Sequence, residues 1–371
     1  AKYAGGFILV LIIAYAVGGA VYTFHVWNYP PEKQAIDTRF ILGTFGSEFL
    51  VNLTAQMAFI PGARSLGQYM LGLLMVIQRS AGGNTTYYLG NVSAAGSRTY
   101  FPLMFLIKEP LAYVLLVFFA LLLAFKKCWL HCASRPVKKW RADLIALIKD
   151  NPAEAGMILV LLVYWFFSLR SHLNIGVRHI LPTLPFTYAL TARQIMHWIR
   201  GGITERIPLY HGFWQLLGLY WKRIKRMALV VLVFLWAVLT VVFVYPFFLS
   251  YFNEIAGGPD NGYKWVVDSN NDWGQDILRL AKFIEQNDIK EIKMDYFSGA
   301  PAEYYIKGVK IIGYNREEPQ KGWLAVSSTI LMGQCKGDKI PCSFDGRAYI
   351  WLDAYKPVAK IGYSIFVYKL E

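Results

Sequence analysis

The stretch "ALVVLVFLWAVLTVVFVYPFFLSYF", Ala228–Phe252, decides the fold class of this chain. It contains no charged residue and is longer than the roughly 20 apolar residues needed to cross a bilayer. Directly after it, the sequence changes to short segments separated by Gly, Pro and Asn. We therefore expect a transmembrane helical region over residues 1–252, followed by a soluble domain over residues 253–371.

The composition agrees with a membrane protein. Of the 371 residues, 56% are hydrophobic and only 17% are charged, which is too apolar for one soluble globule. About five transmembrane helices are predicted in an all-α bundle: Phe7–Trp27, Leu103–Phe125, Gly156–Leu169 with its flanks, Ile180–Ile199 and Ala228–Phe252.

The positive charge indicates how the helices are oriented. Residues 253–371 contain 15 basic and 16 acidic residues, so the remaining 23 basic and 8 acidic residues lie upstream. The upstream excess is concentrated in two loops, Lys126–Glu154 and Arg200–Arg226, and such loops typically face the cytoplasm. This distribution argues against a nucleic-acid partner and places the long loop 28–102 and the C-terminal domain on the outer face. If Phe40–Ile60 were a sixth span, the orientation of everything after it would invert.

The C-terminal segment has the pattern of a small α/β domain. "DWGQDILRLAKFIEQND" predicts a helix with Asp272 as its N-cap and apolar positions at helical spacing. Five segments predict strands: "IKEIKMDYF", "KGVKIIGY", "GWLAVSS", "RAYIWLD" and "IGYSIFVYKL". In the same domain, Cys335 and Cys342 favour a disulfide over free thiols.

Two adjacent charges, Lys108 and Glu109, interrupt the apolar run of the second expected span. Charges at that depth are costly unless they are paired or face a polar cavity. Neighbouring side chains on a helix point about 100° apart, so Lys108 and Glu109 do not easily form an ion pair with each other. A mutual ion pair or snorkelling of Lys108 is one interpretation, and a cavity that holds an anionic group near Lys108 is the other.

A second basic cluster is expected at the same outer surface. Arg178 and His179 begin the fourth expected span, near Arg170 and His172 at the end of the third. Arginine binds phosphate oxygens through paired donors, so this loop is a candidate site for a lipid-linked phosphate, with ordinary headgroup binding as the alternative. Arg98 and Tyr100 immediately precede the second span and are expected above Lys108. The predicted substrate-binding residues are thus Lys108, Glu109, Arg178, His179, Arg98 and Tyr100.

Four strings carry a family resemblance. They are "GGNTTYYLGNVSAAGSRTYFPLMFLIKEPL", "NIGVRHILPTLPF", "YFNEIAGGPDNGYKWVVDSNNDWGQDILRLAKFI" and "IGYSIFVYKL", in order from Gly82 to Leu370. Together they resemble bacterial family 39-like glycosyltransferases, which are related to protein O-mannosyltransferases and to the aminoarabinose transferase of lipid A.

The resemblance implies a GT-C architecture in the bacterial cytoplasmic membrane. The implied activity is transfer of a sugar from a polyprenyl-phosphate carrier to an extracytoplasmic protein, lipid or glycan acceptor. It implies donor or acceptor contacts for Lys108, Arg178 and His179, whereas Glu109 departs from the Thr expected after that Lys.

The catalytic residue is not assigned on this chain. The family's acidic residue lies in the first outer loop near the true N-terminus, and the match suggests that this chain begins several spans later. Nothing around Glu32, Asp37 or Glu48 matches that motif. The chemistry also requires positive charge at the leaving phosphate, which side chains or a divalent cation can supply.

Other interpretations stay open. Asp268, Asn270, Asp272 and Asp276 are spaced like calcium ligands, although Gly274 falls one place late and Arg279 stands where a Glu is needed. For the whole chain, the main alternative is a non-catalytic membrane scaffold or lipid-binding subunit with an outer recognition domain. A transporter is less favoured, because the spans show no internal repeat.

Overall fold

The structure is a computed structural model that describes residues 2–93, 95–134, 136–201, 213–299, 301–312, 318–333 and 349–371. Contacts divide the chain into two compact units, Ala1–Asn84 and Thr85–Glu371. The boundary expected after Phe252 therefore does not coincide with this division, because the C-terminal domain is bonded to helices that precede it.

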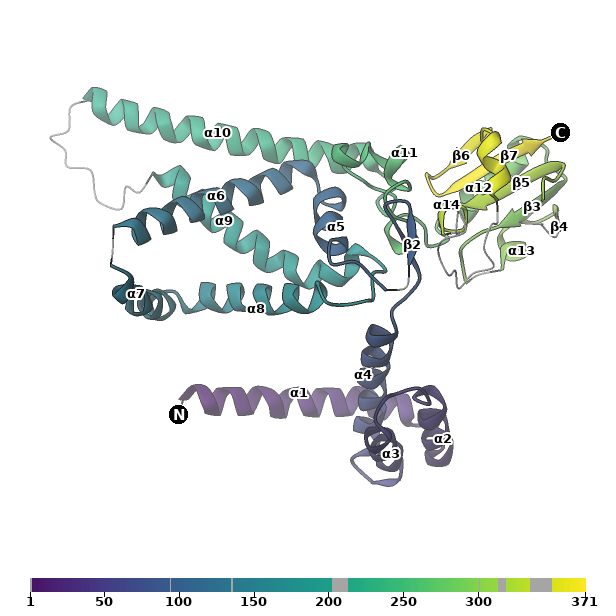
Figure 1. Ribbon diagram of the computed structural model, residues 1–371, viewed down its shortest axis with the longest axis horizontal. Helices are drawn as coiled ribbons and strands as arrows, with labels where there is room; N and C mark the ends of the chain where they lie inside the picture. The colour runs from purple at the N-terminus through teal and green to yellow at the C-terminus, as the bar shows by residue number, and fades with distance from the viewer. Residues whose placement is uncertain are drawn as a thin grey trace. The chain divides into compact units, whose positions relative to one another are not determined.

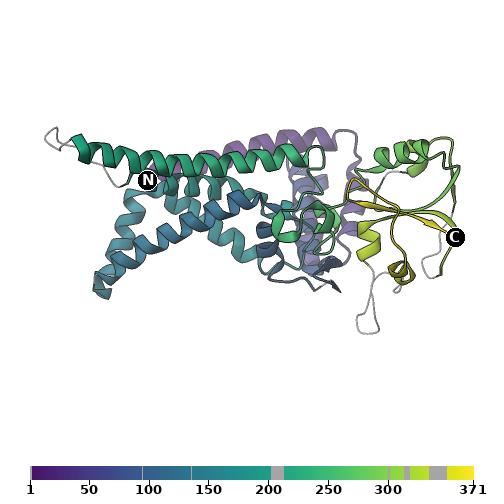
Figure 2. The same cartoon turned by 90° about the horizontal axis from the view of Figure 1, so that it is seen from above.

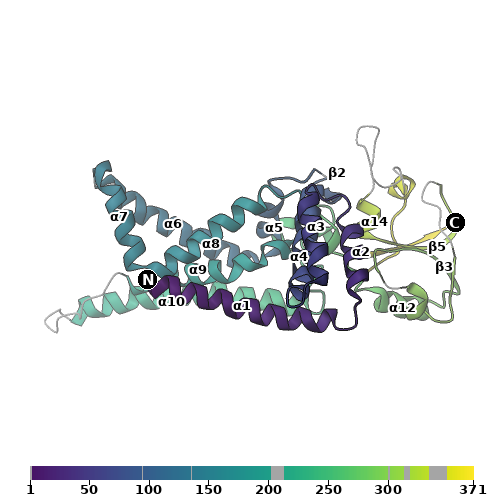
Figure 3. The ribbon, with the colours of Figure 1, turned by 90° about the horizontal axis from the view of Figure 1, so that it is seen from below.

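The first unit is helical. It contains α1 (Lys2–Val26), α2 (Pro31–Ile41), α3 (Glu48–Gln56), the short 3₁₀ helix η1 (Met57–Phe59) and α4 (Arg64–Gly82). Figure 3 shows α1 crossing α4, with α2 and α3 packed beside α4. A turn separates α2 from α3, so no single helix runs through Phe40–Ile60 and the alternative of a sixth span there is wrong.

The second unit begins with a hairpin and a helical region. The hairpin is β1 (Thr86–Tyr88) with β2 (Asn91–Ser93). The helices that follow are α5 (Tyr100–Lys108), α6 (Leu111–Ala133), α7 (Val137–Asp150), α8 (Pro152–Ser168), η2 (Val177–Thr183), α9 (Leu184–Arg200) and α10 (Phe213–Val244). In Figures 1 and 2, α6 and α10 lie side by side, and α9 packs against both.

Three helices among the described residues are long and apolar enough to cross a membrane. Their apolar parts are Gly5–Val26, Leu111–His131 and Tyr220–Val244, and Pro152–Ser168 is a shorter apolar helix. These helices are compatible with a helical membrane part, which is followed by a small domain that contains a sheet. The helix that contains most of the last predicted span begins within the predicted basic loop Arg200–Arg226, because α10 is one helix of 32 residues.

The predicted span Leu103–Phe125 is corrected to two helices. Pro110 lacks an N–H, and it disfavours helical geometry in the residue before it. Glu109 accordingly adopts an extended conformation, and α5 ends at Lys108 before α6 begins at Leu111. Lys108 and Glu109 therefore lie at a helix break rather than inside a span.

The C-terminal domain contains a five-stranded mixed sheet. Its strands are β3 (Glu291–Asp295), β4 (Lys310–Ile312), β5 (Gly322–Ser327), β6 (Ala359–Ile361) and β7 (Ile365–Leu370), in the order β4-β3-β5-β7-β6. β3 is parallel to β4 and β5, and β7 is antiparallel to β5 and β6. The short helices of the unit are η3 (Glu254–Ala256), α11 (Pro259–Gly262), η4 (Asp268–Asn270), α13 (Ala302–Tyr305), α14 (Ser328–Met332) and η5 (Ile350–Ala354).

Both faces of this sheet are covered, which explains the nearly continuous buried runs of β5 and β7. Ala325 and Val367 pack on one face against α12 (Ile277–Gln286), and Leu324 and Phe366 pack on the other against α14 and η5. Figure 1 shows α12 and the sheet together at the C-terminal end of the chain. The predicted small α/β domain is thus present as a three-layer arrangement.

Two local predictions in this domain are wrong. The described part of "RAYIWLD" forms the 3₁₀ helix η5 rather than a strand, and Tyr349 before it has a left-handed conformation with φ of 59°. The residue at the N-cap position of α12 is Asp276, not Asp272, and its side chain makes no capping bond. Cys335 and Cys342 lie outside the described residues, so the disulfide stays a prediction.

Candidate functional site

The site is built where α5 meets the segment after α10 and the loop before α12. We call this meeting point the junction and define it by Tyr100, Lys108, Asn253 and the loop Asp268–Asp276. All of these residues fall within the second compact unit.

Lys108 is the basic residue at the centre of the junction. Its Nζ donates hydrogen bonds to the carbonyl oxygens of Leu249 at 2.8 Å, Tyr251 at 2.6 Å and Asn270 at 2.5 Å. It also lies 4.2 Å from the centroid of the Phe252 ring. An ammonium group has three hydrogens, so backbone carbonyls use all of its donors. In this conformation Lys108 has no donor left for a phosphate.

Glu109 is engaged separately from its neighbour. The residue is only 8% exposed, and its Oε2 accepts a hydrogen bond from Tyr188 Oη at 3.3 Å. The Tyr188 ring in turn packs edge-on against Tyr113, with centroids 4.4 Å apart. The two adjacent charges are therefore held by different partners, one at the last residue of α5 and the other at the extended residue that follows.

Asn253 satisfies the carbonyls that become free where α5 ends. The last carbonyls of any helix have no partner within the helix. Here the Asn253 backbone N–H donates to Ile107 O at 2.9 Å, and its Nδ2 donates to Leu106 O at 2.6 Å and Glu109 O at 2.9 Å. Asn253 is 1% exposed. The backbone and the side chain of this one residue thus fix the start of the C-terminal domain to the end of α5.

Asn270 links three segments that are far apart in sequence. Its Nδ2 donates to Tyr100 Oη at 2.8 Å, and its Oδ1 accepts from the backbone N–H of Val177 at 2.9 Å. Its own carbonyl accepts from Lys108. Both Asn270 and Tyr100 are fully buried. Tyr100, a predicted substrate-binding residue, is therefore placed in the protein core.

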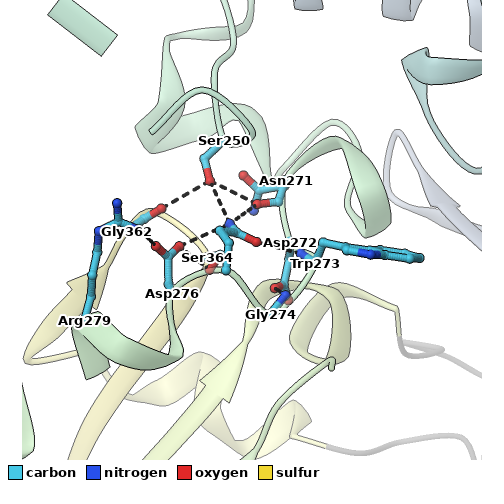
Figure 4. Close-up of polar contacts among 10 residues, drawn as sticks. Ser250, Asn271, Asp272, Trp273, Gly274, Asp276, Arg279, Gly362 and Ser364 are labelled. Atoms are coloured by element: carbon cyan, nitrogen blue, oxygen red, sulfur yellow. Dashed lines mark hydrogen bonds and ion pairs between the residues drawn. The ribbon is translucent and has the colours of Figure 1, made fainter. Parts of the chain in front are cut away.

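The loop residues after Asn270 join the junction to the sheet, and Figure 4 shows the contacts of Asn271 and Asp276. Asn271 Nδ2 donates to Ser328 Oγ at 2.8 Å, while its carbonyl accepts from Ser250 Oγ at 3.0 Å. Asp276 pairs with Arg279 and accepts from Ser364 Oγ at 2.6 Å. Because Asp276 is already paired in this way, the geometry does not support the alternative of a calcium loop.

Asp272 is a buried carboxyl in the same loop. It is 1% exposed, and its Oδ1 accepts from the Gly274 backbone N–H at 3.1 Å. Its Oδ2 has no hydrogen bond within the described part of the chain, although Ser327 and Thr329 lie close enough to favour the charged form. Burial outweighs these contacts and raises the pKa of Asp272 to about 6.

The exposed edge of the junction carries Arg178. Its guanidinium lies 5.1 Å from the centroid of the Trp273 ring, and Trp273 is 53% exposed. The Trp273 ring also packs edge-on against the Phe297 ring, with centroids 5.6 Å apart. A guanidinium that lies over an aromatic face does not use its N–H donors in that contact, because the donors point outward in the plane of the guanidinium. Arg178 can therefore still bind an oxyanion.

The remaining predicted residues are placed differently. Arg98 is exposed and lies in the turn before α5. His179 is partly buried, its ring lies 6.4 Å from that of Phe101, and its carbonyl accepts from Tyr164 Oη at 2.7 Å. Of the six predicted substrate-binding residues, the structure thus leaves Arg98 and Arg178 at the surface.

Sequence reasoning missed the roles of Asn253, Asn270 and Trp273. All three lie in the longest of the quoted strings, and the family resemblance of that string was the signal that could have pointed to them. Among the described residues, no group of three His, Cys, Asp or Glu side chains is arranged to hold a metal ion.

Comparison of the chain with protein-family models, with curated proteins and with solved structures found no match.

Proposed function

We propose that this chain acts in a membrane glycosyltransferase that moves a sugar from a polyprenyl-phosphate carrier to an extracytoplasmic acceptor. The observation that supports the proposal most is the convergence of three quoted strings on Asn270. Tyr100 and Lys108 come from the first string, Val177 from the second and Asn270 itself from the third. Segments with the family's pattern thus form one bonded structure, with Arg178 at its surface.

In the proposed reaction, Arg178 binds the phosphate of the carrier. The bond between the anomeric carbon and the acceptor oxygen forms while the bond to the phosphate oxygen breaks, and the phosphate keeps the electron pair. Paired guanidinium donors stabilise the charge that develops on the departing phosphate. The acceptor hydroxyl loses its proton to a carboxylate, and we assign no residue of this chain to that role.

Lys108 has a positioning role in this proposal. It orders the carbonyls of Leu249, Tyr251 and Asn270, and so fixes the loop that carries Trp273 beneath Arg178. This differs from the initial expectation that Lys108 itself contacts the phosphate.

The second candidate is a non-catalytic membrane scaffold or lipid-binding subunit. The observation that favours it is that the donors of Lys108 and the carboxylate of Glu109 are used inside the protein.

One experiment separates the two candidates. Purified full-length protein in lipid nanodiscs is given a radiolabelled polyprenyl-phosphate sugar and a cell-envelope acceptor fraction. Protein-dependent transfer of label from the lipid phase to the acceptor fraction supports the glycosyltransferase. Donor binding without transfer supports the lipid-binding subunit, and the absence of both contradicts the proposal.

A further inference from the structure

The helices α2, α3 and α4 of the first compact unit have large apolar side chains on the outside. Phe40 of α2 is 85% exposed, and Phe49 of α3 is 73% exposed. α4 presents Leu73, Val76 and Ile77 on one exposed face, because positions i, i+3 and i+4 of a helix point the same way. A unit surrounded by water normally buries such side chains, and a surface patch of them indicates a contact with an apolar partner.

The interior between these helices contains small and polar side chains instead. Ala35, Ala55 and Ala58 form an apolar cluster there. Thr38 and Thr54 are also buried, and each donates its hydroxyl hydrogen to a carbonyl oxygen of its own helix. Small residues between closely packed helices, with large apolar residues outside, are typical of helices that pack in lipid.

The contact between α4 and α1 gives the depth of these helices. Figures 1 and 3 show α2 and α4 running across the direction of α1. Ser65 of α4 lies close to Gly19 of α1. The Tyr69 ring packs edge-on against the Tyr22 ring, with centroids 5.6 Å apart. At a rise of 1.5 Å per residue, Tyr22 and Gly19 lie about 6 Å and about 10 Å before Val26, where the apolar part of α1 ends.

This depth is that of a helix lying in the plane of a membrane. Such a helix places its apolar face about 5–10 Å into the boundary between headgroups and acyl chains. The charges of α4 fit this position, because Ser65–Gln78 contains no charged residue and Arg64 and Arg79 stand on either side of it. Long basic side chains at the ends of an apolar segment can extend to the headgroups.

We propose that α2, α3 and α4 form an interfacial layer embedded in the bilayer leaflet at which the C-terminal end of α1 lies. The partner of the exposed apolar side chains is lipid. The depth of the α1 contact and the small residues of the interior favour lipid over a second copy of this chain. The first part of the expected outer loop 28–102 is then membrane-embedded. The inference does not rest on the proposed glycosyltransferase activity and uses none of its residues.

Photo-crosslinking of the full-length protein in nanodiscs tests this layer. The discs contain one synthetic phosphatidylcholine and are wide enough for two copies of the protein. The photoreactive residue p-benzoylphenylalanine replaces Phe40, Phe49 or Val76, one at a time. Because all three positions are exposed, we expect the variants to fold, which unchanged thermal melting checks. After irradiation, mass spectrometry shows whether the adduct contains lipid or a second protein chain.

Two further positions serve as controls. Tyr15 is exposed near the middle of the apolar part of α1 and should react with lipid. Lys282 is exposed on α12 and should not. We expect lipid adducts at all three layer positions, with yields at least about tenfold above that at Lys282. Fragment spectra should place the Val76 adducts near the glycerol end of the acyl chain and the Tyr15 adducts near its middle.

The other outcomes overturn the proposal. Mainly protein–protein adducts would show that a second copy covers the apolar face. A yield no higher than that at Lys282, at any of the three layer positions, would show that the position faces water. Absence of lipid adducts at Tyr15 would also contradict the proposal, because the proposed depth requires α1 to lie in the bilayer. Sugar transfer and carrier binding at Arg178 are separate measurements, so failure here is distinguishable from failure of the proposed function.

Discussion

The Nζ atom of Lys108 lies 2.5 Å from the carbonyl oxygen of Asn270, across 162 positions of sequence. Together with the bonds to Leu249 and Tyr251, this contact joins the end of α5 to the start of the C-terminal domain. A lysine that looked like a ligand-binding charge in a span is thus the centre of a structural connection.

Replacing Lys108 should therefore destabilise the protein before it affects any ligand. Lys108→Met keeps most of the apolar stem but leaves three backbone carbonyls without a donor. We expect a loss of about 2–5 kcal/mol in the free energy of unfolding, measured by denaturation in nanodiscs. Lys282→Met, at an exposed position of α12, is the control and should change stability by less than about 0.5 kcal/mol. Equal stability of both variants would show that the carbonyl contacts contribute nothing.

Asn253 permits a test of the cap on α5. Asn253→Asp removes the two N–H donors that reach Leu106 and Glu109 and places a carboxylate against those carbonyls. We expect a loss of about 2–4 kcal/mol. Asn287 also donates to a helix carbonyl, Phe283 O at 2.8 Å, but it is exposed. Because water can replace that bond, Asn287→Asp should cost less than about 1 kcal/mol. Hydrogen exchange of the last α5 amides should accelerate only in Asn253→Asp.

The buried carboxyl of Asp272 makes stability depend on pH. Its pKa is about 6 in the folded protein, against an ordinary value of 3.8, so the folded state binds more protons between these two values. Stability should therefore fall as pH rises from about 4 to about 6, by about 3 kcal/mol in total. Asp276 lies near Asp272, and burial raises its pKa as well, so it adds to the same slope.

Asp272→Asn isolates this contribution. The amide keeps an oxygen for the Gly274 N–H but carries no charge. Melting temperatures between pH 4 and pH 8 should show a flatter profile for the variant and a stability at pH 7.5 at least equal to that of the unchanged protein. A variant that is less stable at pH 7.5 and keeps the original pH profile would contradict the assignment.

Position 362 requires glycine, because its backbone lies close to the Asp276 side chain. It has φ of 58°, and a Cβ built there would lie 2.0 Å from Asp276 Cγ. Gly362→Ala should therefore cost more than the backbone strain alone, in total at least about 3 kcal/mol. Gly308 also has a positive φ, of 74°, but a Cβ there meets no atom within 4 Å, so Gly308→Ala should cost only about 1–2 kcal/mol. A thermal shift that is the same in both variants would remove the steric explanation.

The sequence predicted the helical membrane part and the small α/β domain because hydrophobic length and period are local properties. It predicted β3, β5 and the apolar face of α12 for the same reason. The strand predicted at "RAYIWLD" is wrong, because the apolar residues there lie in a 3₁₀ helix that packs against the sheet. It also joined α5 to α6, although the effect of Pro110 is a local signal that was available.

The site was harder to predict, since its bonds join residues far apart in sequence. The charge of Lys108 was visible, but its three carbonyl partners come from segments more than 140 positions away. No sequence pattern distinguishes a lysine that binds carbonyls from one that binds phosphate. Arg178 was predicted from its position at a helix start, but the Trp273 ring beneath it follows only from the fold.

The most direct test of the proposed function is the affinity of the protein for polyprenyl phosphate. Photo-crosslinking titrations of the full-length protein in nanodiscs would compare Arg178→Ala with Arg170→Ala. Arg170 is likewise exposed and stacks on an aromatic ring, that of Phe166 at 3.7 Å, so it controls for general headgroup attraction. We expect Arg178→Ala to raise Kd by about tenfold or more and Arg170→Ala by less than about threefold. Equal affinities in the two variants would contradict a carrier-phosphate site at Arg178.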